Sequence, residues 1–309
     1  MHVRRRVGAS IAILTGLLGI ASRVVAQIPA STRCGVGIPA SEVSGYVPLP
    51  RGDVFCPLLA DPKGQRSFVS YLHETSDQGD MNVGSVGISD AFGLLRVGGP
   101  KPGDGFQVSL AGSVFAQFDL GTASYDLLNA DYVVGLPLTF RRGWFSTRVR
   151  IYHQSSHLGD EYLLREPADR QDRENLSFEA VEWLLSADGG PMRIYGGGEW
   201  LFNQSPEDLG TYTAHGGIEL RPQARIIPLG SLGGFRFVAA ADVKSSEEQD
   251  WDPAFSARGG LEYDRAGGTD ATARRWGIFA EFYTGPSPYG QFFREKVRLA
   301  GVGIHFGGF

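Results

Sequence analysis

Long stretches of this chain alternate between apolar and polar side chains, and the alternation runs further than in most soluble sheets. From Phe106 to Leu120 the even positions are mostly apolar and the odd positions mostly small or polar. Successive side chains of a β-strand point to opposite faces, so the stretch predicts one strand with two unlike faces. Strands of globular proteins usually have about 3–10 residues. A strand that crosses a bilayer obliquely and extends beyond it accommodates the greater length.

The stretch from Trp144 to Ser155 favours a membrane setting. One face carries Phe145, Thr147, Val149, Ile151, His153 and Ser155, and the opposite face includes Arg148 and Arg150. A strand in a soluble core would need partners for two arginines behind its apolar face, whereas the wet lumen of a membrane barrel accepts them. On this interpretation His153 and Ser155 lie at the lipid-facing rim.

The same alternation recurs along the chain and predicts twelve strands. They cover residues 68–74, 81–96, 106–120, 132–140, 144–155, 176–186, 193–202, 212–221, 235–244, 255–264, 275–282 and 298–306. An even number of strands places both ends of a barrel on one side of the membrane, as in bacterial outer-membrane barrels. A soluble β-sandwich would also alternate, but charges of both signs on the polar faces favour the barrel. We predict an all-β fold, a transmembrane antiparallel β-barrel over residues 66–309.

The chain before the barrel divides into two predicted segments. A basic start, an apolar run over residues 7–21 and small residues before Gln27 predict a secretory signal peptide over residues 1–26. Residues 27–65 contain six prolines and no sustained period. We therefore expect a short, irregular, extended N-terminal segment in the periplasm, followed by a barrel in the cell outer membrane.

Composition limits the remaining classes. The two cysteines, Cys34 and Cys56, precede the predicted barrel. In an oxidising compartment such a pair most often forms a disulfide, and no nearby histidine or third cysteine completes a metal site. The formal net charge of −5 argues against nucleic acid as a partner. After Ala26 no run of eighteen apolar residues predicts a transmembrane helix.

The predicted lumen carries charges of both signs. They include Arg148, Arg150, Glu199, Glu219, Arg236, Asp242, Arg258 and Glu281. These side chains would either line a pore for a small solute or pair across a closed interior. A twelve-strand barrel is narrow, so mixed signs favour closure by ion pairs.

Four runs of the sequence resemble a bacterial family known as domain of unknown function 1207. They are Phe-Ala-Gln-Phe-Asp-Leu at 115–120, Leu-Asn-Ala-Asp-Tyr at 128–132, Gly-Leu-Pro-Leu-Thr-Phe-Arg at 135–141 and Tyr-His-Gln-Ser-Ser-His-Leu-Gly-Asp-Glu at 152–161. The resemblance covers most of the chain after the predicted signal peptide. It implies no particular activity.

A second, local resemblance carries chemistry. His153-x-Ser155 on a strand, then a polar loop and Asn175 at the start of the next strand, is similar to outer membrane phospholipase A, a twelve-strand barrel with an outward-facing catalytic triad. The resemblance implies that Ser155 is the nucleophile, His153 its general base and Asn175 the group that orients the imidazole. Residues i and i+2 of a strand share a face, so His153 and Ser155 are placed suitably.

The same resemblance implies further partners. Calcium helps to form the oxyanion site in that family, and Asp160 and Glu161 could supply hard oxygen ligands here. Outer-membrane lipids would be the substrate, the protein could form a homodimer, and the barrel-assembly machinery would insert it.

Alternatives remain open from the sequence. If Leu176, Phe178 and Ala180 face lipid, Asn175 points inward and the triad fails. His153, Ser155 and His157 would also suit a polar rim, with Asp160, Glu161 and Arg165 forming salt bridges in an ordered loop. Three function classes follow: an acyl-lipid hydrolase, a small-solute channel or transporter, and a structural or adhesion barrel with loop 157–174 as its outward contact.

Overall fold

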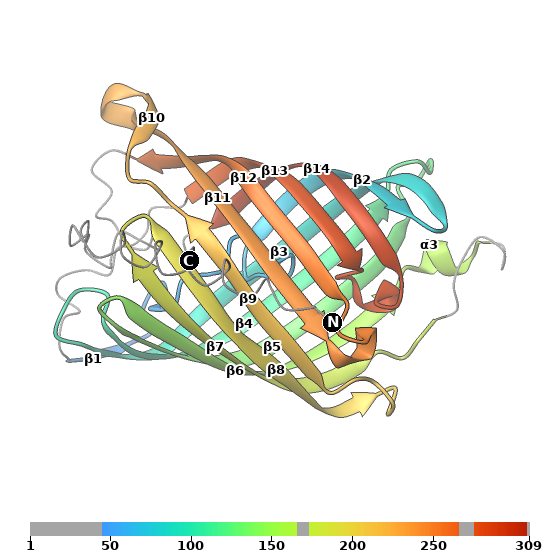
Figure 1. Ribbon diagram of the computed structural model, residues 1–309, viewed down its shortest axis with the longest axis horizontal. Helices are drawn as coiled ribbons and strands as arrows, with labels where there is room; N and C mark the ends of the chain where they lie inside the picture. Colours follow the sequence, from blue (N-terminus) through green and yellow to red (C-terminus); the bar gives the residue numbers. More distant parts are fainter. Residues whose placement is uncertain (1–44, 166–172, 266–274, 308–309) are drawn as a thin grey trace, which may run out of the picture.

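The computed structural model describes residues 45–165, 173–265 and 275–307, and its strands form one sheet that closes into a barrel (Figure 1). The strands are β1 Gly45–Pro48, β2 Ser67–Ser76, β3 Gly79–Gly98, β4 Gly105–Asp119, β5 Leu127–Arg142, β6 Phe145–Leu158, β7 Ser177–Gly189, β8 Met192–Ser205, β9 Tyr212–Leu220, β10 Arg225–Pro228, β11 Gly233–Ser246, β12 Pro253–Arg265, β13 Arg275–Pro286 and β14 Lys296–Gly307. The short helices are α3 Asp160–Leu163, η4 Gly230–Leu232, η5 Glu247–Gln249 and η6 Gly290–Phe292.

Twelve of these described strands make the barrel, and each is antiparallel to its neighbours. The seam closes where β14 pairs with β2, with His305 opposite Phe68. The two remaining strands are additions: β1 pairs with the end of β3, and β10 pairs with β11. The prediction of a twelve-strand antiparallel barrel is confirmed.

The two faces of the wall differ as the alternation predicts. On β11, Arg236 is 1% exposed and points into the lumen, while the next residue, Phe237, is 41% exposed on the outside. The apolar outer face and charged inner face are those expected of a barrel surrounded by lipid. Among the described residues no helix is long and apolar enough to span a membrane.

The barrel has two unlike ends. Figure 1 shows α3 and the β2–β3 hairpin at one end, and β1 and β10 at the other. We call them the α3 end and the β1 end. The connection from β6 to β7, which includes α3, is among the long ones of the α3 end.

The segment between β1 and β2 lies inside the barrel. Sequence reasoning placed residues 27–65 in the periplasm as an extended lead-in, whereas residues 50–65, here called the plug, pass through the lumen. Phe55 and Leu58 pack against Leu184 and Tyr195 of the wall. Five of the plug's apolar side chains are almost fully buried: Val54, Phe55, Leu58, Leu59 and Ala60.

Side chains of the barrel wall hold the plug by donating hydrogen bonds to its backbone carbonyls. The contacts, between 2.6 and 3.0 Å, are Arg96 with Arg51 and Gly52, Arg141 with Val54, Arg193 with Cys56, Arg258 with Leu59, and Ser256 with Ala60. An irregular backbone inside a membrane barrel must find donors outside itself, and the arginines of the lumen supply them. The prolines and the lack of a hydrophobic period in this part of the sequence predicted a loose segment. They are equally compatible with an irregular segment that is bound inside the barrel.

The lumen charges pair with one another. Glu182 accepts hydrogen bonds from Arg148 at 2.8 Å and from Arg150 at 3.1 Å, and Arg258 contacts Glu281 at 3.0 Å. The prediction that mixed charges close the interior by ion pairs is confirmed for these residues.

Glu182→Gln should lower the free energy of unfolding by about 3–5 kcal/mol, because it leaves Arg148 and Arg150 buried with no carboxylate. The change is measured by urea unfolding of the refolded barrel in detergent micelles. The matched control is Glu207→Gln in an exposed loop, which we expect to change stability by less than about 0.5 kcal/mol. Equal effects of the two substitutions would contradict the role given to the Glu182 pairs.

Two predictions lie outside the described residues. The signal peptide over residues 1–26 precedes them, and so does Cys34, one of the two cysteines of the predicted disulfide. Cys56 is buried in the plug. Both the cleavage and the disulfide stay predictions.

Candidate functional site

The outer face of β6 carries His153 and Ser155 near the α3 end. Inward neighbours on the same strand, Tyr152 and Gln154, are buried in the lumen, so the alternation sends His153 and Ser155 outward. His153 lies opposite Glu179 of β7 in the strand register. Its Nδ1 lies 3.0 Å from Glu179 Oε1, and the two side chains are 39% and 31% exposed.

A β-bulge next to this pair adds a third side chain. The register between β7 and β8 shifts between Ser177 and Glu179, and Asn203 there has a φ of 50°. A bulge can re-aim a side chain, and bulges are frequent beside active sites. Asn203 Nδ2 donates to Glu179 Oε2 at 2.6 Å. The carboxylate of Glu179 is therefore held between Asn203 and the imidazole of His153.

Ser155 lies on the outer face two residues after His153. Its neighbours across the sheet are Tyr132 on β5 and Ser177 on β7. The Cα atoms of His153 and Ser155 are two residue steps apart along the strand, roughly 7 Å. No hydrogen bond joins the described side chains of Ser155 and His153.

Asn175 points outward and not into the lumen, so its direction does not exclude it from a triad with His153 and Ser155. Leu176, Phe178 and Ala180 are buried on the lumen side of the barrel, and Asn175 is exposed. Its Nδ2, however, donates to Ser205 Oγ at 3.3 Å. The carboxylate of Glu179 is the group in contact with His153.

A shallow groove on the outer surface leads to His153. Its walls include Ile88, Val114, Tyr132 and Val134, and His153 stands at one side. Its floor contains Gly112, at which an added Cβ would meet nothing within 4 Å. The missing side chain of Gly112 leaves a mostly apolar hollow open on the outer surface, with Asp90, which lies opposite Gly112 in the strand register, in its lining.

Asp160 and Glu161 form the exposed first turn of α3. Successive residues of a helix do not face each other, so two adjacent carboxylates cannot enclose a cation by themselves. Among the described residues, no group of three His, Cys, Asp or Glu side chains could hold a metal ion. The donors seen here therefore do not fit a calcium site.

Arg165, after α3, takes other partners than the loop carboxylates considered from the sequence. Its Nη2 lies 2.9 Å from Asp119 and 2.9 Å from Asp126. Both acids belong to the β4–β5 connection or its border, so Arg165 joins two neighbouring loops of the α3 end.

The lumen is filled from both ends. The plug enters from the β1 end, and the connection 287–295 folds into the α3 end, where Gly290 N donates to Asp131 Oδ2 at 3.1 Å and Gln291 N to Asn129 Oδ1 at 3.0 Å. Lys63 of the plug reaches the same Asp131 at 2.7 Å. The two closing segments thus meet on one carboxylate.

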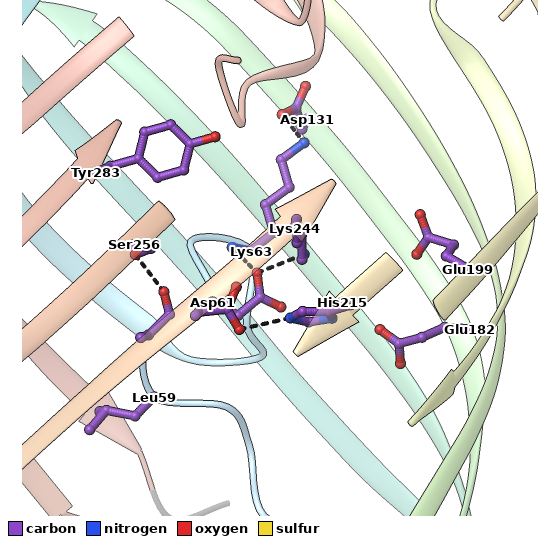
Figure 2. Close-up of polar contacts among 12 residues, drawn as sticks. Leu59, Asp61, Lys63, Asp131, Glu182, Glu199, His215, Lys244, Ser256 and Tyr283 are labelled. Carbon is purple, nitrogen blue, oxygen red and sulfur yellow. Dashed lines mark hydrogen bonds and ion pairs between the residues drawn. The ribbon is translucent and has the colours of Figure 1, made fainter. Parts of the chain in front are cut away.

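A cavity of about 230 Å³ remains between these segments. Figure 2 shows Asp61 of the plug with Lys244, and His215 beside them, with Tyr283 and Glu199 on opposite sides. Lys244 Nζ lies 2.9 Å from Asp61, and His215 Nε2 lies 2.7 Å from Asp242. The polar groups around this cavity are mostly paired within the chain.

Sequence reasoning did not identify Glu179 or Asn203. Glu179 is two residues after Ser177 on an alternating strand and therefore shares its face. This alternation was the only signal in the sequence that pointed to Glu179. Its contact with His153 depends on the register of β6 with β7, and the long connection between these strands fixes no register in advance. Asn203 additionally depends on a bulge.

Comparisons with known proteins agree with the fold. A family model described as protein of unknown function (DUF1207) matches residues 23–308. No curated protein matches the chain significantly.

Solved structures give the same architecture. Outer membrane phospholipase A from Escherichia coli is 15% identical, with a TM-score of 0.53 over 81% of this chain and 93% of that one. The Salmonella typhi enzyme, solved as a dimer with bound calcium, is 15% identical, with a TM-score of 0.52 and the same coverage. KdgM porin is 11% identical, with a TM-score of 0.40 over 78% of this chain and 98% of that one. At 15% identity, the likeness to the two phospholipase structures shows a shared barrel fold alone, and function must be argued from the site.

Proposed function

Because this chain belongs to the family described as protein of unknown function (DUF1207), whose name carries no activity, we propose its function from the lipid-facing rim. We propose an acyl-lipid hydrolase of the outer membrane that cleaves phospholipid esters. The observation that carries the proposal is the outward His153, hydrogen bonded to Glu179 and two residues before Ser155.

The proposed chemistry gives each side chain one role. Glu179 at Nδ1 favours the imidazole tautomer with its proton on Nδ1, which leaves Nε2 free to accept a proton. Ser155 Oγ attacks the ester carbonyl and transfers its proton to Nε2, and the imidazole then protonates the departing alcohol. Water attacks the acyl-serine ester with the same base, which releases the fatty acid and restores Ser155.

The groove supports a lipid as the substrate. An acyl chain lying against Ile88, Val114 and Val134 would bury apolar surface on both partners and bring its ester toward His153. A substrate that diffuses in the outer leaflet reaches the groove without leaving the membrane. This requires the α3 end to face the cell exterior, as the proposal assumes.

The proposal is tested by fatty-acid release from phospholipid in mixed detergent micelles by the refolded full chain. Release above the rate of a heat-unfolded sample is expected. Parallel samples with added calcium and with chelator test whether calcium changes the rate, although Asp160 and Glu161 by themselves do not form a site for it. Cross-linking in the same micelles tests the proposed homodimer. A folded barrel with no release under any condition would exclude the hydrolase.

Glu179→Gln should lower kcat for this reaction by at least about tenfold, because the amide no longer holds the imidazole in one tautomer. Asn175→Ala should leave kcat within about twofold, since Asn175 contacts Ser205 rather than His153. Substrate binding should change little in either variant, so KM is measured alongside kcat. The opposite pattern would restore Asn175 as the orienting group.

A further inference from the structure

A second cavity, of about 50 Å³, lies at the β1 end of the lumen between the plug and the barrel wall. Residues of the plug, among them Asp53 and Phe55, form one side. Four arginines, Arg66, Arg148, Arg221 and Arg275, line it together with Glu262. The cavity exceeds the roughly 30 Å³ that one water occupies in the liquid, so it has room for a small polyatomic group.

Arg66 is the unusual member of this lining. It is 7% exposed, and its Nε has no hydrogen-bond partner. Within the described residues its guanidinium takes part in no ion pair, and its one ring contact is with Phe279, 5.9 Å from the centroid. A buried and uncompensated charge is costly.

The carboxylates near Arg66 are already shared among other arginines. Glu262 pairs with Arg221 at 3.4 Å, with Arg236 at 2.5 Å and with Arg275 at 3.2 Å. Glu219 pairs with Arg193 at 3.5 Å and again with Arg221 at 3.4 Å. Counting Arg66, five guanidinium groups face two carboxylates in this part of the lumen.

The other charges at the cavity do not remove the excess. Asp53 accepts hydrogen bonds from Thr139 and from the backbone of Phe55, and Arg148 is paired with Glu182. Asp90 contributes to the lining, but it is exposed on the outside of the barrel. Arg221 Nε and Arg193 Nη2 also lack hydrogen-bond partners.

We propose that this cavity is a binding site for a phosphate group, held by Arg66 and Arg221 between the plug and the wall. Guanidinium groups recognise phosphate by paired, charge-assisted hydrogen bonds. A bound dianion would offset the surplus positive charge and satisfy the free nitrogens. The phosphate could be inorganic or belong to a lipid headgroup. The site is at the opposite end of the barrel from Ser155, so it is independent of the proposed hydrolase.

Calorimetric titration of the refolded full chain with inorganic phosphate, in a phosphate-free nonionic detergent and at constant ionic strength, tests the site. We expect saturable binding that chloride does not reproduce. Arg66→Gln should weaken it by at least tenfold, as loss of charge-assisted hydrogen bonds to one group costs about 10- to 100-fold. Arg142→Gln, at an exposed position of the β1 end, should bind as the wild type does.

Thermal unfolding supplies a second readout. Without phosphate, Arg66→Gln should unfold at a higher temperature than the wild type, because it removes an unpaired buried charge. With saturating phosphate this advantage should disappear. If Arg66→Gln does not fold, Arg66→Lys, which keeps the charge and loses the planar fork, should still weaken phosphate binding.

Short-chain phosphatidylglycerol added to the same micelles distinguishes the source. Stabilisation by this lipid but not by inorganic phosphate, lost in Arg66→Gln, would assign the site to a headgroup phosphate. Stabilisation by neither, equal stabilisation of wild type and Arg66→Gln, or an equal response to chloride would overturn the proposal.

Discussion

Ser155→Ala should reduce fatty-acid release from phospholipid micelles by at least about a thousandfold, since without the hydroxyl no acyl-serine intermediate forms. The variant should keep its barrel, because Ser155 is on the outer face and contributes no packing to the lumen. Its circular dichroism spectrum and its heat-modified migration in gels should match those of the wild type. Release is measured at saturating lipid, where the effect falls on kcat.

Ser177→Ala is the matched control for this substitution. Ser177 lies directly across from Ser155 on the same outer face, so it removes an equivalent hydroxyl from the same surface. We expect it to retain at least about half of the wild-type rate, as surface substitutions away from a reacting group usually do little. Full activity of Ser155→Ala together with loss of activity in Ser177→Ala would identify Ser177, and not Ser155, as the nucleophile.

A chain without residues 27–65 should conduct ions in a planar bilayer at least about tenfold better than the full chain, which should stay closed. The plug occupies the lumen, and its backbone carbonyls accept hydrogen bonds from Arg193 and Arg258. Without it, water would enter to solvate these groups and would form a conducting path. The excess of arginines predicts that the opened barrel prefers anions.

A deletion limited to residues 27–44 leaves the plug intact and should remain closed. If the truncated chain does not refold, the full chain with both Arg193→Gln and Arg258→Gln weakens the same attachment and should show transient openings. A full chain that conducts steadily would contradict the closed lumen and would favour a channel.

The architecture was predictable because alternation is a local property of the sequence. The alternation within each strand predicts which of its faces meets lipid, and Arg236 beside Phe237 illustrates how strongly the two faces differ. The strand number and the outward direction of His153 and Ser155 follow from the same period of two. Pairing of the lumen charges follows from their mixed signs.

The plug and the partner of His153 could not be predicted because they depend on contacts between distant residues. The plug has no period of its own, and its place is set by arginines far away in the sequence, as in the contact of Arg141 with Val54, 87 residues apart. Glu179 meets His153 only through the register across a long connection. On β7 the apolar residues Phe178 and Ala180 face inward, where they pack within the lumen rather than against lipid.

The filled lumen limits how this sequence can change over evolutionary time. A lipid-facing position can drift among apolar residues, since each such side chain meets only acyl chains. A lumen position cannot change alone, because Glu182 serves two arginines and Asp131 serves both the plug and the connection 287–295. Among homologues we therefore expect correlated replacement inside the barrel, and independent variation outside it everywhere except around His153, Ser155 and Glu179.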